Sequence, residues 1–125
     1  MKTARRQFGD LGEKAAATFL KNLGYKIIEF NFQNNSGRML GEIDIIAKDG
    51  REIVFVEVKT RQMEKYANTL PEENITYSKL HKLSRIANAY LRQKGWENEE
   101  YRFDAVSVWL DLEGKKAKIK HISHL

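Results

Sequence analysis

Hydrophobic residues recur at helical spacing in two long segments of the chain. From Ala4 to Leu23 apolar residues return every three or four positions, which predicts an amphipathic helix ended by Gly24. The stripe expected to be buried is Phe8, Leu11, Ala15, Phe19 and Leu23. Thr76 to Lys94 predicts a second helix, ended by Gly95, whose buried side is Leu80, Leu83, Ile86, Ala87, Tyr90 and Leu91.

Five other segments are rich in β-branched and aromatic residues and predict strands. These are Tyr25 to Phe32, Gly41 to Lys48, Ile53 to Thr60, Arg102 to Leu110 and Ala117 to Ile122. Residues 33–40 have the composition of a loop, and residues 62–74 form a polar segment expected to be mobile. The resulting order is α-β-β-β-α-β-β. A strand, a long crossover with a helix and another strand indicate a parallel pair in a mixed sheet, hence a single α/β domain over residues 1–125 with helices covering the sheet.

Asp49-Gly50 joins the second and third strands as a hairpin, and this hairpin carries the candidate chemistry. Alternate residues of a strand share a face, so Ile43, Ile45 and Ala47 lie opposite to Glu42, Asp44 and Ile46. On the next strand Glu57 and Lys59 share a face with Ile53 and Phe55. If residues 49–52 make the connection, Asp44 lies across from Glu57; if only Asp49-Gly50 do, Glu57 lies on the diagonal. Both registers place the two carboxylates on one face.

Two carboxylates at this spacing repel each other, and each raises the pKa of the other. A divalent cation relieves that conflict, since carboxylate oxygens are ligands that Mg²⁺ prefers. Lys59 points to the same side, where its ammonium would hold an attacking water and stabilise charge on a phosphoryl transition state. Two plainer interpretations stay open: a solvated charged face and a structural ion pair.

The composition favours a nucleic-acid partner and excludes thiol chemistry. Lys and Arg number 22 against 17 Asp and Glu, a net charge of +5, and there is no cysteine. A basic balance favours phosphate contacts, and the absence of cysteine removes disulfides and cysteine-ligated metals. The first residues have no apolar core of signal-peptide length, and no apolar run approaches the roughly 20 residues of a membrane span. We therefore expect a cytoplasmic protein with no membrane partner.

Asp44 followed by Glu57-Val58-Lys59 resembles the PD-(D/E)xK nuclease motif, although Ile43 stands where that motif has proline. Residues 41–44, residues 55–61 and Arg102-Phe103-Asp104 together resemble the YraN-like family of bacterial proteins over nearly the whole chain. That family is related to archaeal Holliday-junction resolvases. The resemblance implies a restriction-endonuclease-like fold and leaves the substrate open.

The resemblance also implies roles for individual residues. Asp44 and Glu57 would bind Mg²⁺ or Mn²⁺ with the Val58 carbonyl as a third ligand, and Lys59 would be the catalytic lysine. Glu13, on the first helix, would bind metal through water or relay a proton; a plain surface glutamate is the alternative. Lys79 would lie near the phosphate, and as a cation in the first turn of a helix it opposes the helix dipole.

The remaining polar residues are open to less specific interpretations. Six cations form either a DNA-binding rim or an ordinary basic surface: Arg38, Arg61, Lys65, Lys79, Lys82 and Arg85. Asp104 begins a strand next to the site, where a carboxylate can support the metal ligands; pairing with Arg102 is the expected alternative, and no catalytic role is assigned. His81, His121 and His124 have no metal-ligand spacing and are expected at the surface. Trp96 and Trp109 are expected to pack in or near the core.

Three functions remain open from the sequence. The first is a metal-dependent endonuclease or resolvase acting on DNA, branched or junction DNA included; since resolvases act as dimers, a homodimer is compatible with it. The second is a nucleic-acid-binding module of nuclease fold that cleaves little or not at all. The third is a partner-binding protein in a DNA-processing or envelope-linked system. Metal-dependent nicking, DNA binding at low salt and stabilisation by Mn²⁺ distinguish the three.

Overall fold

A computed structural model describes residues 3–33, 41–63, 76–111, 113 and 115–125. The elements follow the predicted order: helix α1 (Ala4–Asn22), strands β1 (Lys26–Gln33), β2 (Glu42–Asp49) and β3 (Glu52–Gln62), helix α3 (Tyr77–Lys94), and strands β4 (Tyr101–Asp111) and β5 (Lys116–Ile122). The predicted loop between β1 and β2 and the polar segment before α3 lie largely outside the described residues. No described helix is both long enough and apolar enough to cross a membrane.

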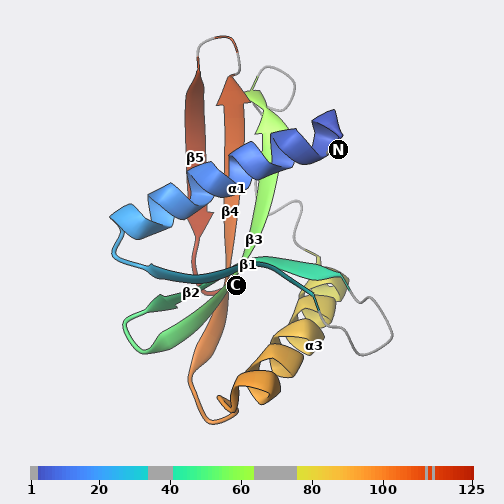
Figure 1. The fold of residues 1–125 in the computed structure, drawn as a ribbon, viewed down its shortest axis with the longest axis vertical. Helices are drawn as coiled ribbons and strands as arrows, with labels where there is room; N and C mark the ends of the chain where they lie inside the picture. Colours follow the sequence, from blue (N-terminus) through green and yellow to red (C-terminus); the bar gives the residue numbers. More distant parts are fainter. Residues whose placement is uncertain (1–2, 34–40, 64–75, 112, 114) are drawn as a thin grey trace.

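The five strands form one mixed sheet in the order β1-β2-β3-β4-β5. β3 and β4 are parallel, as the crossover through α3 requires, and the other neighbouring pairs are antiparallel. Figure 1 shows α1 crossing β3, β4 and β5, while α3 lies beside the other end of the sheet. This arrangement confirms the α/β, restriction-endonuclease-like fold expected from the sequence.

Helix α1 packs on one face of the sheet, but through a different side than its apolar spacing predicts. Its buried residues are Gly12, Ala16, Ala17 and Leu20, whereas Leu11 is 50% exposed and Leu23 is 52% exposed. The reason is close contact: a Cβ built on Gly12 would lie 1.8 Å from Thr60 Oγ1. Small residues therefore face β3, and the predicted stripe of larger residues was wrong at these two positions.

The other face of the sheet packs against α3. Leu83, Ile86, Ala87, Tyr90 and Leu91 are buried there, which confirms the predicted side of this helix except that Leu80 is half-buried. They contact a cluster that includes Ile46, Ile53 and Phe55, the apolar neighbours of Glu57 on its strand face. Glu57 therefore sits at the end of a buried apolar surface.

The β2–β3 hairpin resolves the register that the sequence left open. Asp49 pairs with Glu52 and Ile45 with Val56, so the connection spans residues 49–52, and the pairing of the two strands ends just before Asp44 and Glu57. Alternation holds for Ile45 and Ala47, which pack on the α1 side. Ile43 departs from it: this residue and its partner Phe32 pack on the α3 side. Asn31, between Phe30 and Phe32, has φ 54°, outside the extended range of a regular strand, although β1 continues to Gln33.

Candidate active site at the fork between β2 and β3

β2 and β3 separate where the candidate site lies. β3 pairs with β2 from Glu52 to Val56, but it pairs with β4 along its whole length, from Ile53 to Gln62. In Figure 1, β1 and β2 run across the view while β3, β4 and β5 run along its long axis. We call this opening the β2–β3 fork. Asp44 bridges its base, since Asp44 Oδ2 accepts a hydrogen bond of 2.7 Å from the Val58 amide.

Three carboxylates from two elements meet at the fork. Single oxygens of Glu13 from α1 and of Glu42 and Asp44 from β2 all lie within 4.8 Å of one another. Alternation places Glu42 and Asp44 on one side of β2. The contact between Gly12 and β3 brings the neighbouring Glu13 to the same place. Glu42 also contacts Arg6 Nη1 at 3.4 Å and accepts a 3.2 Å hydrogen bond from Gln33 Nε2.

The carboxylates at the fork disfavour one another's charged forms. Burial raises the pKa of Asp44 to about 8, and the charges of Glu57, Glu13 and Glu42 act in the same direction, opposed by the hydrogen bond from Val58. Burial also raises the pKa of Glu13, against the opposing effects of Arg6 and of a hydrogen bond with Asn31. The cluster would bind a proton or a cation readily, because Arg6 and Gln33 balance its carboxylates only in part.

Asn31 adds a neutral oxygen beside this acidic cluster. Its side chain hydrogen-bonds Glu13, while its buried amide oxygen has no hydrogen-bond partner within the described part of the chain. A buried acceptor without a donor is uncommon and points to a missing ligand or ordered water. Carboxylate and amide oxygens are the donor set of a hard cation such as Mg²⁺ or Mn²⁺. The residues present therefore fit a divalent metal.

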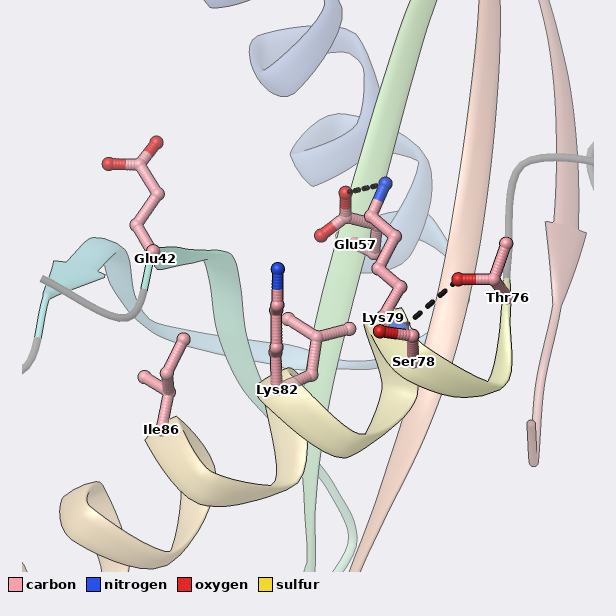
Figure 2. Close-up of a pocket in the computed structure, with 9 residues that line it drawn as sticks. Glu42, Glu57, Thr76, Ser78, Lys79, Lys82 and Ile86 are labelled. Carbon is pink, nitrogen blue, oxygen red and sulfur yellow. Dashed lines mark hydrogen bonds and ion pairs between the residues drawn. The ribbon is translucent and has the colours of Figure 1, made fainter.

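Glu57 has different neighbours from the three clustered carboxylates. Its side chain is 9% exposed, and Glu57 Oε1 lies 2.9 Å from Lys79 Nζ and 3.7 Å from Lys59 Nζ. Figure 2 shows Lys79 reaching Glu57 from the first turn of α3, whose N-cap, Thr76, accepts from the Lys79 amide. Lys79 therefore opposes the dipole of its own helix in order to neutralise a buried carboxylate on β3.

The two lysines differ in how firmly they hold their protons. Burial lowers the pKa of Lys59, and the neighbouring Lys79 lowers it further. Burial acts in the same direction on Lys79, but its hydrogen bonds with Lys59 and Glu57 outweigh that effect and raise its pKa overall. Lys79 is thus the firmly charged partner of Glu57, and Lys59 is the group more easily deprotonated.

A pocket opens between the fork and the start of α3. It has a volume of about 380 Å³, and its polar lining includes Glu42, Glu57, Thr76, Ser78, Lys79 and Lys82. Lys82 and Glu42 both line this pocket in Figure 2. Acidic groups on one wall and ammonium groups on the other suit a phosphate bound through a cation on one side and directly on the other.

The structure thus brings Glu13, Asp44, Glu57, Lys59 and Lys79 into one region, together with Lys82. The metal-ligand roles of Glu57 and of the Val58 carbonyl stay predictions, as do the DNA contacts of Arg61, Lys79 and Lys82. Arg61 lies further along β3, on the same side as Glu57 and Lys59. Arg38 and Lys65 lie outside the described residues.

Sequence reasoning did not assign a role to Glu42. The signal was present, because strand alternation puts Glu42 on the same side as Asp44. Its meeting with Glu13 was not readable, since that contact depends on how closely α1 approaches β3.

A second polar cluster surrounds Arg102 and Asp104. Arg102 binds Asp104 at 3.0 Å, Asp49 at 3.2 Å and also Glu52 and the Tyr25 hydroxyl. Asp104 is fully buried and contacts His121 Nε2 at 2.7 Å. The predicted pairing of Asp104 with Arg102 is confirmed. The surface position predicted for His121 was wrong, because β5 pairs with β4 so that His121 packs between Asp104 and the rings of Phe19 and Tyr25.

Comparison with known proteins adds the family. Residues 12–108 match the model of the uncharacterised protein family UPF0102. A UPF0102 protein of Caldicellulosiruptor saccharolyticus is 41% identical over 120 residues, covering 96% of this chain and 97% of its own. One from Moorella thermoacetica is 41% identical over 122 residues, covering 98% and 97%, and one from Symbiobacterium thermophilum is 47% identical over 103 residues, covering 82% of each chain.

The matched residues include both strands of the fork, α3 and most of β4. They also include Glu13, Glu42, Asp44, Glu57 and Lys59. The family match therefore agrees with the YraN-like resemblance carried by the hairpin motifs. The chain belongs to the uncharacterised protein family UPF0102.

Proposed function

We propose that this protein is a Mg²⁺- or Mn²⁺-dependent endonuclease that hydrolyses phosphodiester bonds in DNA. The observation that carries the proposal is the meeting of Glu13, Glu42 and Asp44 at the β2–β3 fork, beside Glu57 and two lysines. Carboxylates crowded together next to ammonium groups suit a substrate that brings both a cation and an anionic phosphate.

Asp44 and its neighbours Glu13 and Glu42 would hold the cation, with Glu57 entering the ligand set when its ion pair with Lys79 opens. Asn31 offers a neutral oxygen beside them. The bound cation supplies Lewis-acid activation of water and neutralises charge on the scissile phosphate. The Val58 amide holds the Asp44 carboxylate in place, so this ligand does not have to be ordered on binding.

The lysines near Glu57 would have different roles toward the phosphate and the attacking water. Lys79 keeps its proton and presents a fixed positive charge to the phosphate when Glu57 turns toward the cation. Lys59, whose pKa is lowered, donates a hydrogen bond to the attacking water and exchanges its proton more easily. Lys82 lines the same pocket and would contact a neighbouring phosphate.

The test is cleavage of end-labelled linear, flapped and four-way-junction DNA by the wild type in Mg²⁺ or Mn²⁺. Asp44→Asn should reduce the rate by at least about a hundredfold, because it removes a charged ligand while keeping the shape of the side chain. Glu99→Gln, a substitution of an exposed carboxylate remote from the fork, is the matched control and should cleave like the wild type. Equal cleavage by the wild type and Asp44→Asn would show that another protein or another site is responsible.

One observation favours a second candidate, a nucleic-acid-binding module that does not cleave. Glu57 is already neutralised by Lys79 at 2.9 Å, and a carboxylate in such a pair is a poor ligand unless the pair opens. This module would bind DNA without needing metal, and Mn²⁺ would leave its melting temperature unchanged. Stabilisation by Mn²⁺ in the wild type but not in Asp44→Asn would show a metal bound at the fork and exclude the metal-independent module.

A further inference from the structure

The face of the sheet that bears Glu57 continues from the fork across β4 to β5. Residues paired across neighbouring strands project from the same face. The register aligns Lys59 with Ser107 and Ser107 with Lys120, and it aligns Arg61 with Trp109 and Trp109 with Lys118. Two rows of side chains therefore run from the candidate site to the edge of the sheet; their middle residues, Ser107 and Trp109, are buried, and the lysines at the edge are exposed.

These rows lie on the side of the sheet away from α1. The intervening residues Val58, Val106 and Val108 pack in the cluster beneath α1, and Ile119 of β5 packs against the same cluster. Their sequence neighbours Lys59, Ser107 and Lys118 therefore point the other way. In the described part of the chain, the cluster beneath α3 reaches β3 and β4 only at Ile53, Phe55 and Phe103, before the rows begin.

Lysines outnumber acidic residues at the β5 edge of this face, where Asp111 of β4 is aligned with Lys116. Lys116, Lys118 and Lys120 alternate along β5 and all are exposed; we call them the β5 lysine row. Lys59 is 38% exposed on the same side. Since neighbouring strands lie about 4.8 Å apart, Lys59 and Lys120 stand only about 10 Å from each other across β4. Scattered surface charge does not predict such alignment on one face.

We infer that the β5 lysine row binds the phosphate backbone of a nucleic-acid strand that extends from the site at the fork. This inference deepens the proposed function, because it names the path taken by the same substrate beyond the point of cleavage. Lysines on an edge strand contact phosphates without reading bases, so this surface should add affinity that is independent of sequence. Its alignment with Lys59 across Ser107 of β4 favours nucleic acid over an acidic membrane, although Ser107 itself is buried between them.

The inference is tested with Lys118→Gln/Lys120→Gln, a double variant that leaves the site at the fork intact. Fluorescence anisotropy with labelled duplex and single-stranded DNA is measured in EDTA over a series of KCl concentrations. Each lost phosphate contact lowers the slope of log K against log[KCl] by about 0.7 to 0.9, so the slope should fall by about 1.4 to 1.8. Affinity near 0.1 M salt should fall about tenfold.

The matched control is Lys21→Gln/Arg92→Gln, which removes the same charge from exposed positions at the ends of α1 and α3. It should keep the wild-type slope within error. An equal loss of slope in both double variants would overturn the inference, because net charge alone would then explain the effect. So would loss of binding to phosphatidylserine vesicles by Lys118→Gln/Lys120→Gln with its DNA slope unchanged.

The same experiment separates this inference from the proposed cleavage. If the wild type binds DNA and the β5 double variant has an unchanged slope, the inference fails alone. If the slope falls as expected while Mn²⁺ gives no cleavage, the inference stands and the endonuclease proposal fails. If the wild type does not bind DNA even at low salt, both fail. Equal melting temperatures of the two double variants would show that an altered fold is not the cause.

Discussion

Acidic side chains gather at two places in this protein, and the neighbouring groups shift the pKa of the central aspartate in opposite directions. Around Arg102, the buried carboxylate of Asp104 meets a guanidinium, an imidazole, a hydroxyl and a backbone amide. At the fork, Asp44 meets one backbone amide and three further carboxylates. Burial alone would raise the pKa of both aspartates. The partners of Asp104 reverse that effect, whereas the carboxylate neighbours of Asp44 add to it.

The difference separates a structural network from a candidate binding site. A protein that needs a buried carboxylate only for folding surrounds it with donors, as β4 and β5 do for Asp104. Carboxylates gathered without enough donors make the folded state less stable, so their arrangement needs another explanation, such as a ligand. Substitutions in the two clusters should therefore change stability with opposite signs.

The largest effect is expected from Arg102→Met. It leaves Asp104 and Glu52 without their main cation, and breaking a buried ion pair costs about 3–5 kcal/mol. Urea unfolding followed by circular dichroism measures the loss. Arg51→Met, at an exposed position of the β2–β3 turn, is the control and should stay within about 0.5 kcal/mol of the wild type. Equal stability of the two variants would remove the structural role of the Arg102 cluster.

Asp104→Asn should destabilise the protein by about 2–4 kcal/mol at pH 7, with a defined pH dependence. Although burial acts to raise the pKa of Asp104, hydrogen bonds with His121 and Arg102 hold it below its usual value. Its contribution is therefore fully present above about pH 4, the pKa of an unfolded aspartate, and is lost as the pH falls through the lower folded pKa. The gap between wild type and variant in urea unfolding should be constant above about pH 5 and shrink in more acidic buffer. A gap that widened in acid would contradict this.

Asp44→Asn should have the opposite sign and stabilise the metal-free protein by on the order of 2 kcal/mol at pH 7. The raised pKa of Asp44 means that ionisation costs the folded state free energy, and this cost grows from about pH 4 until the pH passes the folded pKa of about 8. The asparagine oxygen can still accept from Val58. In EDTA, the free energy of unfolding of the variant should exceed that of the wild type by a margin that grows from pH 5 to pH 8. If the variant is less stable than the wild type at every pH, the neighbouring carboxylates do not destabilise the charged form of Asp44.

Tyr25→Phe should give the smallest change, a loss of about 1 kcal/mol. The hydroxyl accepts from Arg102 and donates to Asp104 at 3.3 Å, yet both groups keep other partners without it. Thermal unfolding resolves a change of this size, and Tyr101→Phe, at an exposed position, serves as the reference. A loss as large as that of Arg102→Met would mean that the network acts as one unit rather than through separate contacts.

Local patterns were enough to predict the strand order and the hairpin. Alternation, the turn at Asp49-Gly50 and the helical spacing of α3 all depend on neighbours in sequence. The pairing of Asp104 with Arg102 was readable for the same reason, since the two residues share a strand face. Asp44 and Glu57 were identified together because one hairpin carries both.

The errors fall where distant segments meet. The surface position predicted for His121 ignored the register of β5 on β4, which brings this histidine to Asp104. The stripe expected on α1 gave weight to large apolar residues, whereas the helix contacts the sheet through Gly12 and alanines. Glu42 had no assigned role because its partner Glu13 arrives from that helix.

The close contact of Gly12 with Thr60 fixes the position of α1 on β3. Because a hydrogen atom is all that fits between them, even one methyl group requires Thr60 or the helix to shift, and a shift of the helix would carry Glu13 with it. Alignment of the acidic cluster is thereby tied to the smallest side chain in the protein. An engineer grafting this helix onto another scaffold has freedom over its outer surface and none at that position.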